Sequence, residues 1–300
     1  MKNERRSTMA LVLSMVIFGT IGIFRRYIPF PSGLIAMARG LIGMLFLLAY
    51  TRMRGIHLSA DSVRKGGWKL ILSGVCLGFN WILLFEAYRY TSVAVATLCY
   101  YMAPILIILV SPLLFQERLT GRKILCVAIA LAGMVLVSGI TEAGGAQAQE
   151  SSRTTGILLG LGAAVLYASV VLLNKVMPSV EAYPKTIVQL GTAAVTLLPY
   201  TLLTETIPTE AFSWLSIGML VLVGIIHTGV AYALYFGSVS GLKAQTAALL
   251  SYLDPVVAIL LSALLLGENL SVPGLIGALM VLGAALLSEM PVGAKKAGES

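Results

Sequence analysis

The chain has 300 residues, of which 58% are hydrophobic and only 11% are charged, and its mean hydropathy is +0.92. A water-facing globular surface cannot accommodate so many apolar side chains, so the composition excludes an ordinary soluble protein and indicates a membrane protein. The formal net charge of +8 would also suit a nucleic-acid partner, and the positions of the basic residues must decide between the two interpretations.

Apolar stretches that could cross a hydrocarbon core of about 30 Å, which takes about 20 helical residues, recur along almost the whole chain. We expect helices, because the lengths and periods fit no membrane β-barrel. The opening MKNERRST is similar to the start of a signal peptide, but the next apolar run is too long and lacks a small-residue cleavage site, so we expect it to be retained. The ten predicted spans are residues 8–27, 32–50, 69–88, 92–114, 121–140, 155–174, 184–203, 213–236, 244–266 and 272–289.

Most of the basic residues lie in loops on one side of the predicted membrane spans. Of the 21 Lys and Arg residues, only Arg25, Arg26, Arg89 and Arg153 fall in the loops opposite the N-terminus, while Arg39 lies inside a span. All the others share the side of the N-terminus, so the positive-inside rule predicts that both termini are cytoplasmic. This topology explains the net charge without a nucleic-acid partner.

The second half of the chain repeats the first. Residues 98–111 (LCYYMAPILIILVS) align with residues 249–262 (LLSYLDPVVAILLS), and QERLT at 116–120 aligns with GENLS at 267–271. We therefore predict two five-helix repeats, residues 8–140 and 155–289, joined by a polar outer linker at 141–154. Because five is odd, the second repeat enters the membrane from the opposite side, which gives the inverted repeats of many secondary transporters.

The repeated hinges also predict helix ends. Thr120 and Ser271 fit N-caps of the fifth and tenth helices, and Pro273 fits a first turn. Glu117 and Glu268 then lie at helix junctions near the membrane surface, where we expect capping and not chemistry.

Several of these features together resemble a known family. They are an arginine in MARGLIG (37–43), mid-span prolines in the fourth and ninth spans, and the E-R-L-T and E-N-L-S hinges. Over residues 8–289 the chain resembles the EamA family of the drug/metabolite transporter superfamily. The resemblance implies a ten-helix fold, a central substrate cavity lined by both halves, and a carrier of small metabolites in a bacterial inner membrane. Amino acids, other metabolites and drugs all remain open as substrates.

Asp254 is the most costly residue of the ninth span, because it lies about 16 Å along the helix, near the bilayer centre. Its counterpart in the first repeat is Ala103, so the fold itself does not impose an acid there. Three roles remain open: a structural carboxyl that ties helices together, a proton carrier whose neutral form is favoured by loss of hydration, or a counter-charge for a cationic substrate group.

Pro104 and Pro255 interrupt the fourth and ninth spans. Each removes the amide that would bond the carbonyl four residues earlier, at Tyr100 and Ser251. The freed carbonyls could contact substrate, or the prolines could serve only a packing kink.

Arg39 is the one basic residue inside a span, and its counterpart Gln189 is neutral. We expect Arg39 to face inwards, where it binds a carboxylate or balances Asp254, with a purely structural ion pair as the alternative. His227 could relay protons or could simply bond between helices. Polar and aromatic residues that could line a cavity, or equally belong to the core, are Asn80, Trp81, Tyr101, Tyr232 and Tyr252.

Catalytic signatures such as H-E-x-x-H, G-x-S-x-G and the P-loop are not found, and no loop is long enough for an ATP-binding domain. Cys76, Cys99 and Cys126 fall within spans as packing residues, and we expect no metal and no cofactor. The leading hypothesis is a secondary transporter, monomeric or homodimeric, that exports a small zwitterionic or amphipathic metabolite by proton antiport. The competing class is a membrane sensor or intramembrane enzyme.

Overall fold

The structure is a computed structural model that describes residues 2–25, 27–91, 96, 99–137, 150–177, 179–206, 212–266 and 272–289. All regular structure within these residues is helical, and they contain no strand. The helices are α1 (Lys2–Arg25), α2 (Ser32–Met53), α3 (Ala60–Tyr90), α5 (Ala103–Phe115), α6 (Gly121–Val137), α7 (Glu150–Lys175), α8 (Ala182–Thr204), α9 (Trp214–Leu222), the π-helix η2 (Val223–Val230), α10 (Ala231–Val239), α11 (Ala244–Leu250), α12 (Leu253–Leu266) and α13 (Val272–Glu289).

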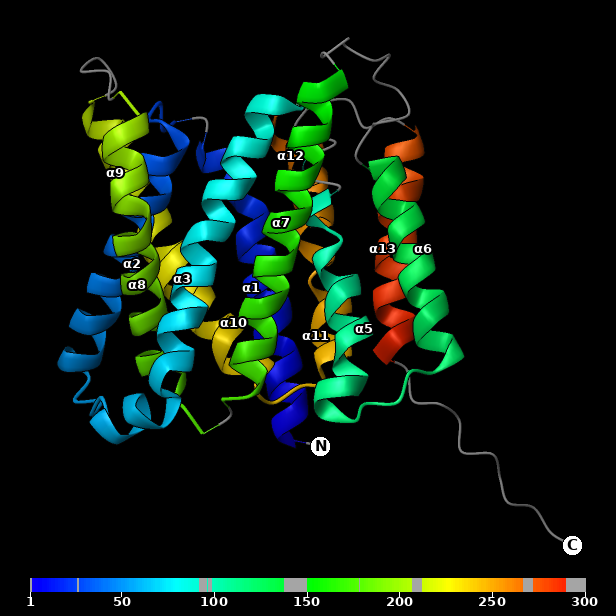
Figure 1. Ribbon diagram of the computed structural model, residues 1–300, viewed down its shortest axis with the longest axis horizontal. Coiled ribbons are helices and arrows are strands. Elements are labelled where there is room, and N and C mark those ends of the chain that lie inside the picture. Colours follow the sequence, from blue (N-terminus) through cyan, green and yellow to red (C-terminus); the bar gives the residue numbers. More distant parts are fainter. Residues whose placement is uncertain are drawn as a thin grey trace, which may run out of the picture.

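The helices run roughly side by side, and α1 begins at the same end of the bundle at which α13 ends (Figure 1). Every one of the ten predicted spans overlaps a described helix. Five helical segments are long and apolar enough to cross a membrane: Ser32–Met53, Val63–Tyr90, Thr154–Lys175, Ala182–Thr204 and Trp214–Val239. The expected all-helical membrane protein is confirmed, while the number of crossings and the orientation of the termini stay predictions.

The last residues of the predicted linker belong to a helix, while the division into two repeats stays a prediction. Residues 141–149 lie outside the described residues, but α7 already begins at Glu150, so residues 150–154 are helical. A carboxylate suits the positive end of a helix, and polar residues can continue a helix beyond the apolar layer. The boundary that we predicted at residue 155 followed the apolar pattern alone.

Two interrupted helices dominate the middle of the bundle. Tyr101 and Met102 form a turn immediately before α5, and Ser251 and Tyr252 form a turn that divides the predicted span 244–266 into α11 and α12. Pro104 and Pro255 each fall in the first turn of the following helix, where a missing amide is tolerated. Each proline therefore lies directly after one of the two turns.

The two breaks touch each other. The Tyr252 hydroxyl donates to the Tyr101 carbonyl at 3.0 Å, and the two rings lie 6.3 Å apart. This bond satisfies a backbone oxygen that the turn leaves without a helical partner.

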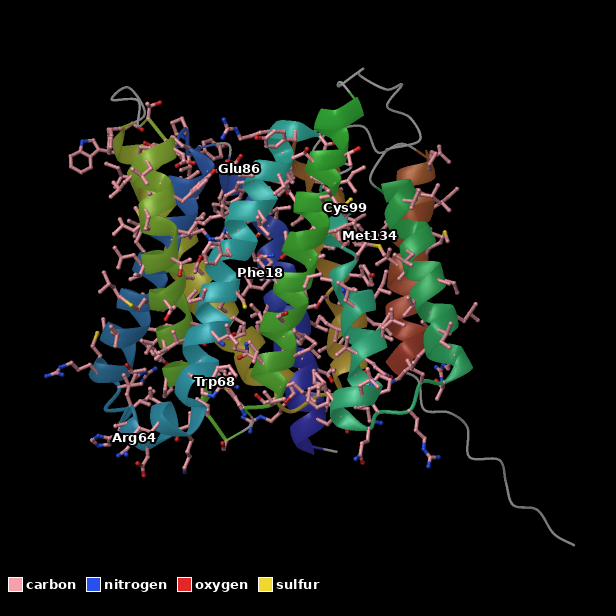
Figure 2. The ribbon with its side chains drawn as sticks, in the orientation of Figure 1. Phe18, Arg64, Trp68, Glu86, Cys99 and Met134 are labelled. Carbon is pink, nitrogen blue, oxygen red and sulfur yellow. The ribbon has the colours of Figure 1, made fainter. Side chains whose placement is uncertain are left out.

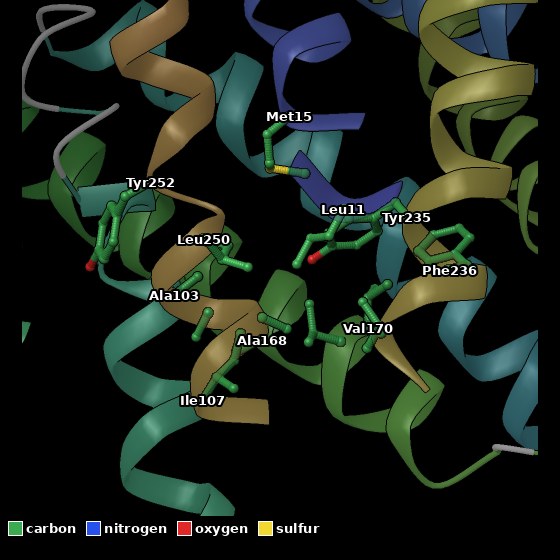
Figure 3. Packing of buried hydrophobic residues seen from close by; sticks show 14 of the residues in the cluster. Leu11, Met15, Ala103, Ile107, Ala168, Val170, Tyr235, Phe236, Leu250 and Tyr252 are labelled. Atoms are coloured by element: carbon green, nitrogen blue, oxygen red, sulfur yellow. The ribbon is translucent and has the colours of Figure 1, made fainter. Parts of the chain in front are cut away.

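The apolar core is shared by both halves of the chain. One cluster of buried residues includes Leu11 and Met15 from α1, Ala103 from α5, Tyr235 from α10 and Leu250 from α11. Figure 3 shows the α1 residues directed toward the side chains of the later helices. Neither half therefore buries its core alone.

The predicted capping residues act as helix caps where they are described. Thr120 Oγ1 accepts from the Lys123 amide at 3.4 Å, and Pro273 is the second residue of α13. Glu117 caps a helix of the other half, because its carboxylate accepts from the amides of Ala244 at 2.9 Å and Gln245 at 3.4 Å. Ser271 and Glu268 lie outside the described residues.

Charged side chains concentrate at the two ends of the bundle. Glu86 and Arg89 form an ion pair at 3.0 Å, and Glu86 also accepts from the Tyr200 hydroxyl. Figure 2 places Glu86 near one end, Arg64 near the other, and Phe18 between them. This distribution suits a chain that crosses an apolar layer.

Candidate functional site

Asp254 faces a small cavity between the two helix breaks. The cavity has a volume of about 40 Å³, and α1, α5, α7 and α12 all contribute to its wall. Its lining residues are Met15, Phe18, Tyr100, Tyr101, Ala103, Pro104, Tyr167, Ser251 and Asp254. About 10–15 Å³ of such volume is enough for one water, so a cavity of this size holds a few waters at most and no metabolite.

The carboxylate of Asp254 lies at the start of a helix and not in its middle. It belongs to the first turn of α12, whose first amides have no helical partners. The positive end of the helix dipole favours a negative charge at this position. The break before α12 thus reduces the cost that a charge would otherwise have inside the membrane.

Arg39 on α2 is held by residues of η2 and α3. Its Nε donates to Thr228 Oγ1 at 3.0 Å, and its guanidinium lies 5.1 Å from the centroid of the Trp81 ring. No ion pair within 4.0 Å joins it to Asp254 in the described part of the chain.

A continuous series of aromatic rings connects Arg39 with the cavity of Asp254. Neighbouring ring centroids lie between 5.0 and 6.4 Å apart, which is the usual range for favourable aromatic pairs. The Tyr167 and Tyr235 hydroxyls also bond to each other at 2.8 Å. In order, the rings are Trp81, Tyr232, Phe18, Tyr235, Tyr167, Tyr100 and Tyr101.

The π-helix η2 contains Thr228, the hydrogen-bond partner of Arg39. A π-helix carries one extra residue per turn and is often found at functional sites. Here it packs against α2 so closely that a Cβ on Gly43 would lie 2.9 Å from the Gly229 nitrogen and 3.0 Å from the Gly224 oxygen. This close approach sets Thr228 beside Arg39 on the neighbouring helix.

His227 precedes Thr228 and binds to α1. Its Nε2 lies 2.8 Å from Thr20 Oγ1, and the Thr20 hydroxyl also bonds the Ile17 carbonyl at 2.7 Å. The ring packs edge-on against Phe24. His227 therefore joins η2 to α1 and does not line the cavity of Asp254.

Two other predicted site residues lie between helices. Asn80 Nδ2 donates to the Ala163 carbonyl at 2.7 Å, which links α3 to α7. Gln189 Nε2 donates to Ser73 Oγ at 2.7 Å, which links α8 to α3. Both side chains are fully buried, and neither lines the cavity of Asp254.

Several residues that shape the site were not among the predicted site residues. Tyr100 and Ser251 were considered only for their carbonyls, yet both residues line the cavity, as does Tyr167. Thr228 was not selected, although a second polar residue after His227 in the apolar GIIHTGV run was a usable signal.

The arrangement offers one anionic and one cationic group separated by an aromatic wall. Such a wall excludes water and binds apolar or aromatic groups, while the two charges could pair with opposite charges on a ligand. Among the described residues, no group of three or more His, Cys, Asp or Glu side chains is placed to hold a metal ion.

Known proteins resemble this chain along nearly its whole length. The profile of the EamA-like transporter family matches twice, at residues 6–139 and 154–290. The uncharacterized transporter YxxF of Bacillus subtilis (strain 168) is 31% identical over 290 residues, which covers 96% of this chain and 90% of that protein. An uncharacterized transporter of Archaeoglobus fulgidus is 29% identical over 289 residues, covering 93% and 94% of the two chains.

A solved crystal structure shares the fold. It matches with a TM-score of 0.82 at 23% identity and covers 94% of this chain and 97% of its own. The family match spans both halves of the sequence, and the relatives are named as transporters. The chain therefore belongs to the EamA-like transporter family.

Proposed function

We propose that the protein is a secondary active transporter that exports a small metabolite, such as an amino acid or a related amphipathic compound, in exchange for protons. The observation that carries this proposal is the meeting of two interrupted helices, one from each half, beside Asp254. Discontinuous helices that meet at the middle of the membrane form the binding sites of many secondary transporters.

The proposed fold has ten crossings arranged as two inverted five-helix repeats, with both termini in the cytoplasm of a bacterial cell and the bundle in its inner membrane. The double family match and the paired helix breaks support this arrangement. Residues of both halves line the cavity of Asp254, so a relative movement of the halves would open it to one side of the membrane at a time.

A zwitterionic metabolite fits the charges best. Its carboxylate would pair with Arg39, whose planar guanidinium suits two parallel hydrogen bonds, and its ammonium group would approach Asp254. The aromatic rings between them would contact the remainder of the molecule. Since the cavity of about 40 Å³ admits a few waters at most, binding requires the wall to open.

Asp254 is also the proposed coupling group. A carboxyl that is alternately exposed to the two aqueous sides can bind a proton on one side and release it on the other. Proton and substrate would compete for this group, which is the requirement for exchange transport. Organic cations and nucleoside-type metabolites are the alternative substrate classes, since a carboxylate surrounded by aromatic rings also suits a cation.

Counterflow in proteoliposomes tests the proposal. Vesicles containing the full chain are loaded with one unlabelled compound from a panel of amino acids, nucleosides and organic cations, and uptake of the same labelled compound is followed. We expect saturable uptake for at least one amino acid. If no compound of the panel exchanges, the transporter assignment fails for these substrates and a sensor or intramembrane enzyme becomes the better description.

A further inference from the structure

A second and much larger cavity lies near the end of the bundle at which α1 begins. Its volume is about 630 Å³, and it lies between the first turns of α1, the last turns of α2, the start of α8 and the length of α10. It shares no lining residue with the cavity of Asp254. We refer to it as the side pocket, and its main wall residues are Arg6, Phe46, Tyr50, Tyr183, Ala233 and Leu234.

The helices around the side pocket do not all pack on one another. Among the four helices that form it, α2 packs on α8, α8 packs on α10 and α10 packs on α1, whereas α1 and α2 hardly touch. The weakest part of the wall therefore lies between α1 and α2. Exposed apolar side chains on both helices, among them Met9 and Leu45, suit contact with the acyl chains of lipids.

The lining of the side pocket is apolar in one part and polar near the start of α1. Phe46, Ala233 and Leu234 present an apolar surface, while Ser7 and the charged Arg6 lie toward the start of α1. A second cation stands close by, because the Arg54 guanidinium lies 5.8 Å from the centroid of the Tyr50 ring. No acidic residue lines the pocket.

We propose that the side pocket binds one anionic phospholipid, whose phosphate contacts Arg6 and Arg54 and whose acyl chain lies between α1 and α2. An arginine binds phosphate oxygens with directed hydrogen bonds, and a basic residue near the membrane surface favours anionic lipids. The pocket lies at the end where the basic loops place the cytoplasmic leaflet. The inference depends on that orientation and on no particular transported substrate.

The test compares two lipids on the purified full chain in detergent. Phosphatidylglycerol and phosphatidylcholine with identical acyl chains are titrated separately, and bound lipid is counted by native mass spectrometry. We expect phosphatidylglycerol to bind more tightly. Arg6→Gln should weaken that binding about fivefold, the factor that corresponds to one basic residue near an anionic lipid.

Arg5→Gln is the matched control, because Arg5 is a neighbouring exposed arginine that does not line the pocket. If Arg5→Gln and Arg6→Gln weaken binding equally, diffuse surface charge explains the effect and the proposal is overturned. Equal retention of the two lipids by the wild-type protein would overturn it as well.

An independent readout needs no variant. Phosphatidylglycerol that carries a photoreactive diazirine on its acyl chain should label peptides of α1, α2 and α10 that contain side-pocket residues. Labelling spread evenly over the outer helices would contradict a defined site. Displacement of the labelled lipid by transported substrates would assign the pocket to the transport path instead.

Discussion

Replacing Gly43 with alanine should reveal how closely α2 and the π-helix pack. A Cβ at this position would lie 2.9 Å from the Gly229 nitrogen, 3.0 Å from the Gly224 oxygen and 3.1 Å from Thr228 Cγ2. Two of these atoms belong to the backbone and cannot rotate away. The helices must therefore separate by a few tenths of an ångström.

The magnitude follows from two opposing effects. Overpacking of this kind costs about 1–3 kcal/mol, while alanine in place of glycine inside a helix returns about 1 kcal/mol. Gly218 on α9 is the matched control, because nothing lies within 4 Å of its added Cβ. The helix-propensity gain is common to both variants, so the difference in their free energies of unfolding, about 1–3 kcal/mol, isolates the close contact.

Unfolding of both purified variants in detergent measures this difference. Gly218→Ala should be as stable as the wild-type protein or more stable, and Gly43→Ala less stable. Because Thr228 binds Arg39, Gly43→Ala should also weaken substrate binding while Gly218→Ala does not. Equal stability of the two variants would refute the close packing of α2 on η2.

Three further substitutions test single contacts. Tyr252→Phe leaves the Tyr101 carbonyl without its hydroxyl donor and should lower the free energy of unfolding by about 1–3 kcal/mol; an unchanged melting temperature would count against the contact between the breaks. Glu117→Ala removes the cap of α11 and should cost about 1 kcal/mol, measured in the same unfolding assay; no loss would mean that the cap is dispensable. Arg39→Lys keeps the charge but loses the planar guanidinium, so the Kd for a carboxylate substrate should rise about tenfold in a binding titration. Arg89→Lys is the control and should leave this Kd unchanged. Equal Kd values for both variants would contradict the proposed role of Arg39.

The helix breaks were predictable because their cause is local. Pro104 and Pro255 lack the amide that a helix interior requires, and no packing arrangement can replace it. Glu117 was likewise predictable as a cap from its place in the hinge. Which helix it caps was not, because the amides of Ala244 and Gln245 come from the other half of the chain.

The composition of the central site was less predictable from the sequence. Asn80 and Gln189 have polar side chains within apolar spans. Such a side chain can line a cavity, or it can form a hydrogen bond between two helices, as both do here. The direction that each faces depends on helix rotation, which a nearly uniform apolar sequence does not specify. The π-helix was also not foreseen, since its extra residue is stabilised by packing on Gly43 and has no periodic signature.

Proton-driven transport by the Asp254→Asn variant is the most direct test of the central claim. Proteoliposomes receive an imposed pH gradient, and accumulation of the labelled substrate is compared with exchange of substrate against substrate in the absence of a gradient. The variant keeps the shape of the side chain but can no longer bind and release a proton. The proposal predicts that it loses gradient-driven accumulation, while exchange of substrate against substrate persists but needs a higher substrate concentration, because the ammonium group has lost its counter-charge. Full gradient-driven accumulation by Asp254→Asn would contradict the coupling role and leave Asp254 as a structural carboxyl at the start of α12.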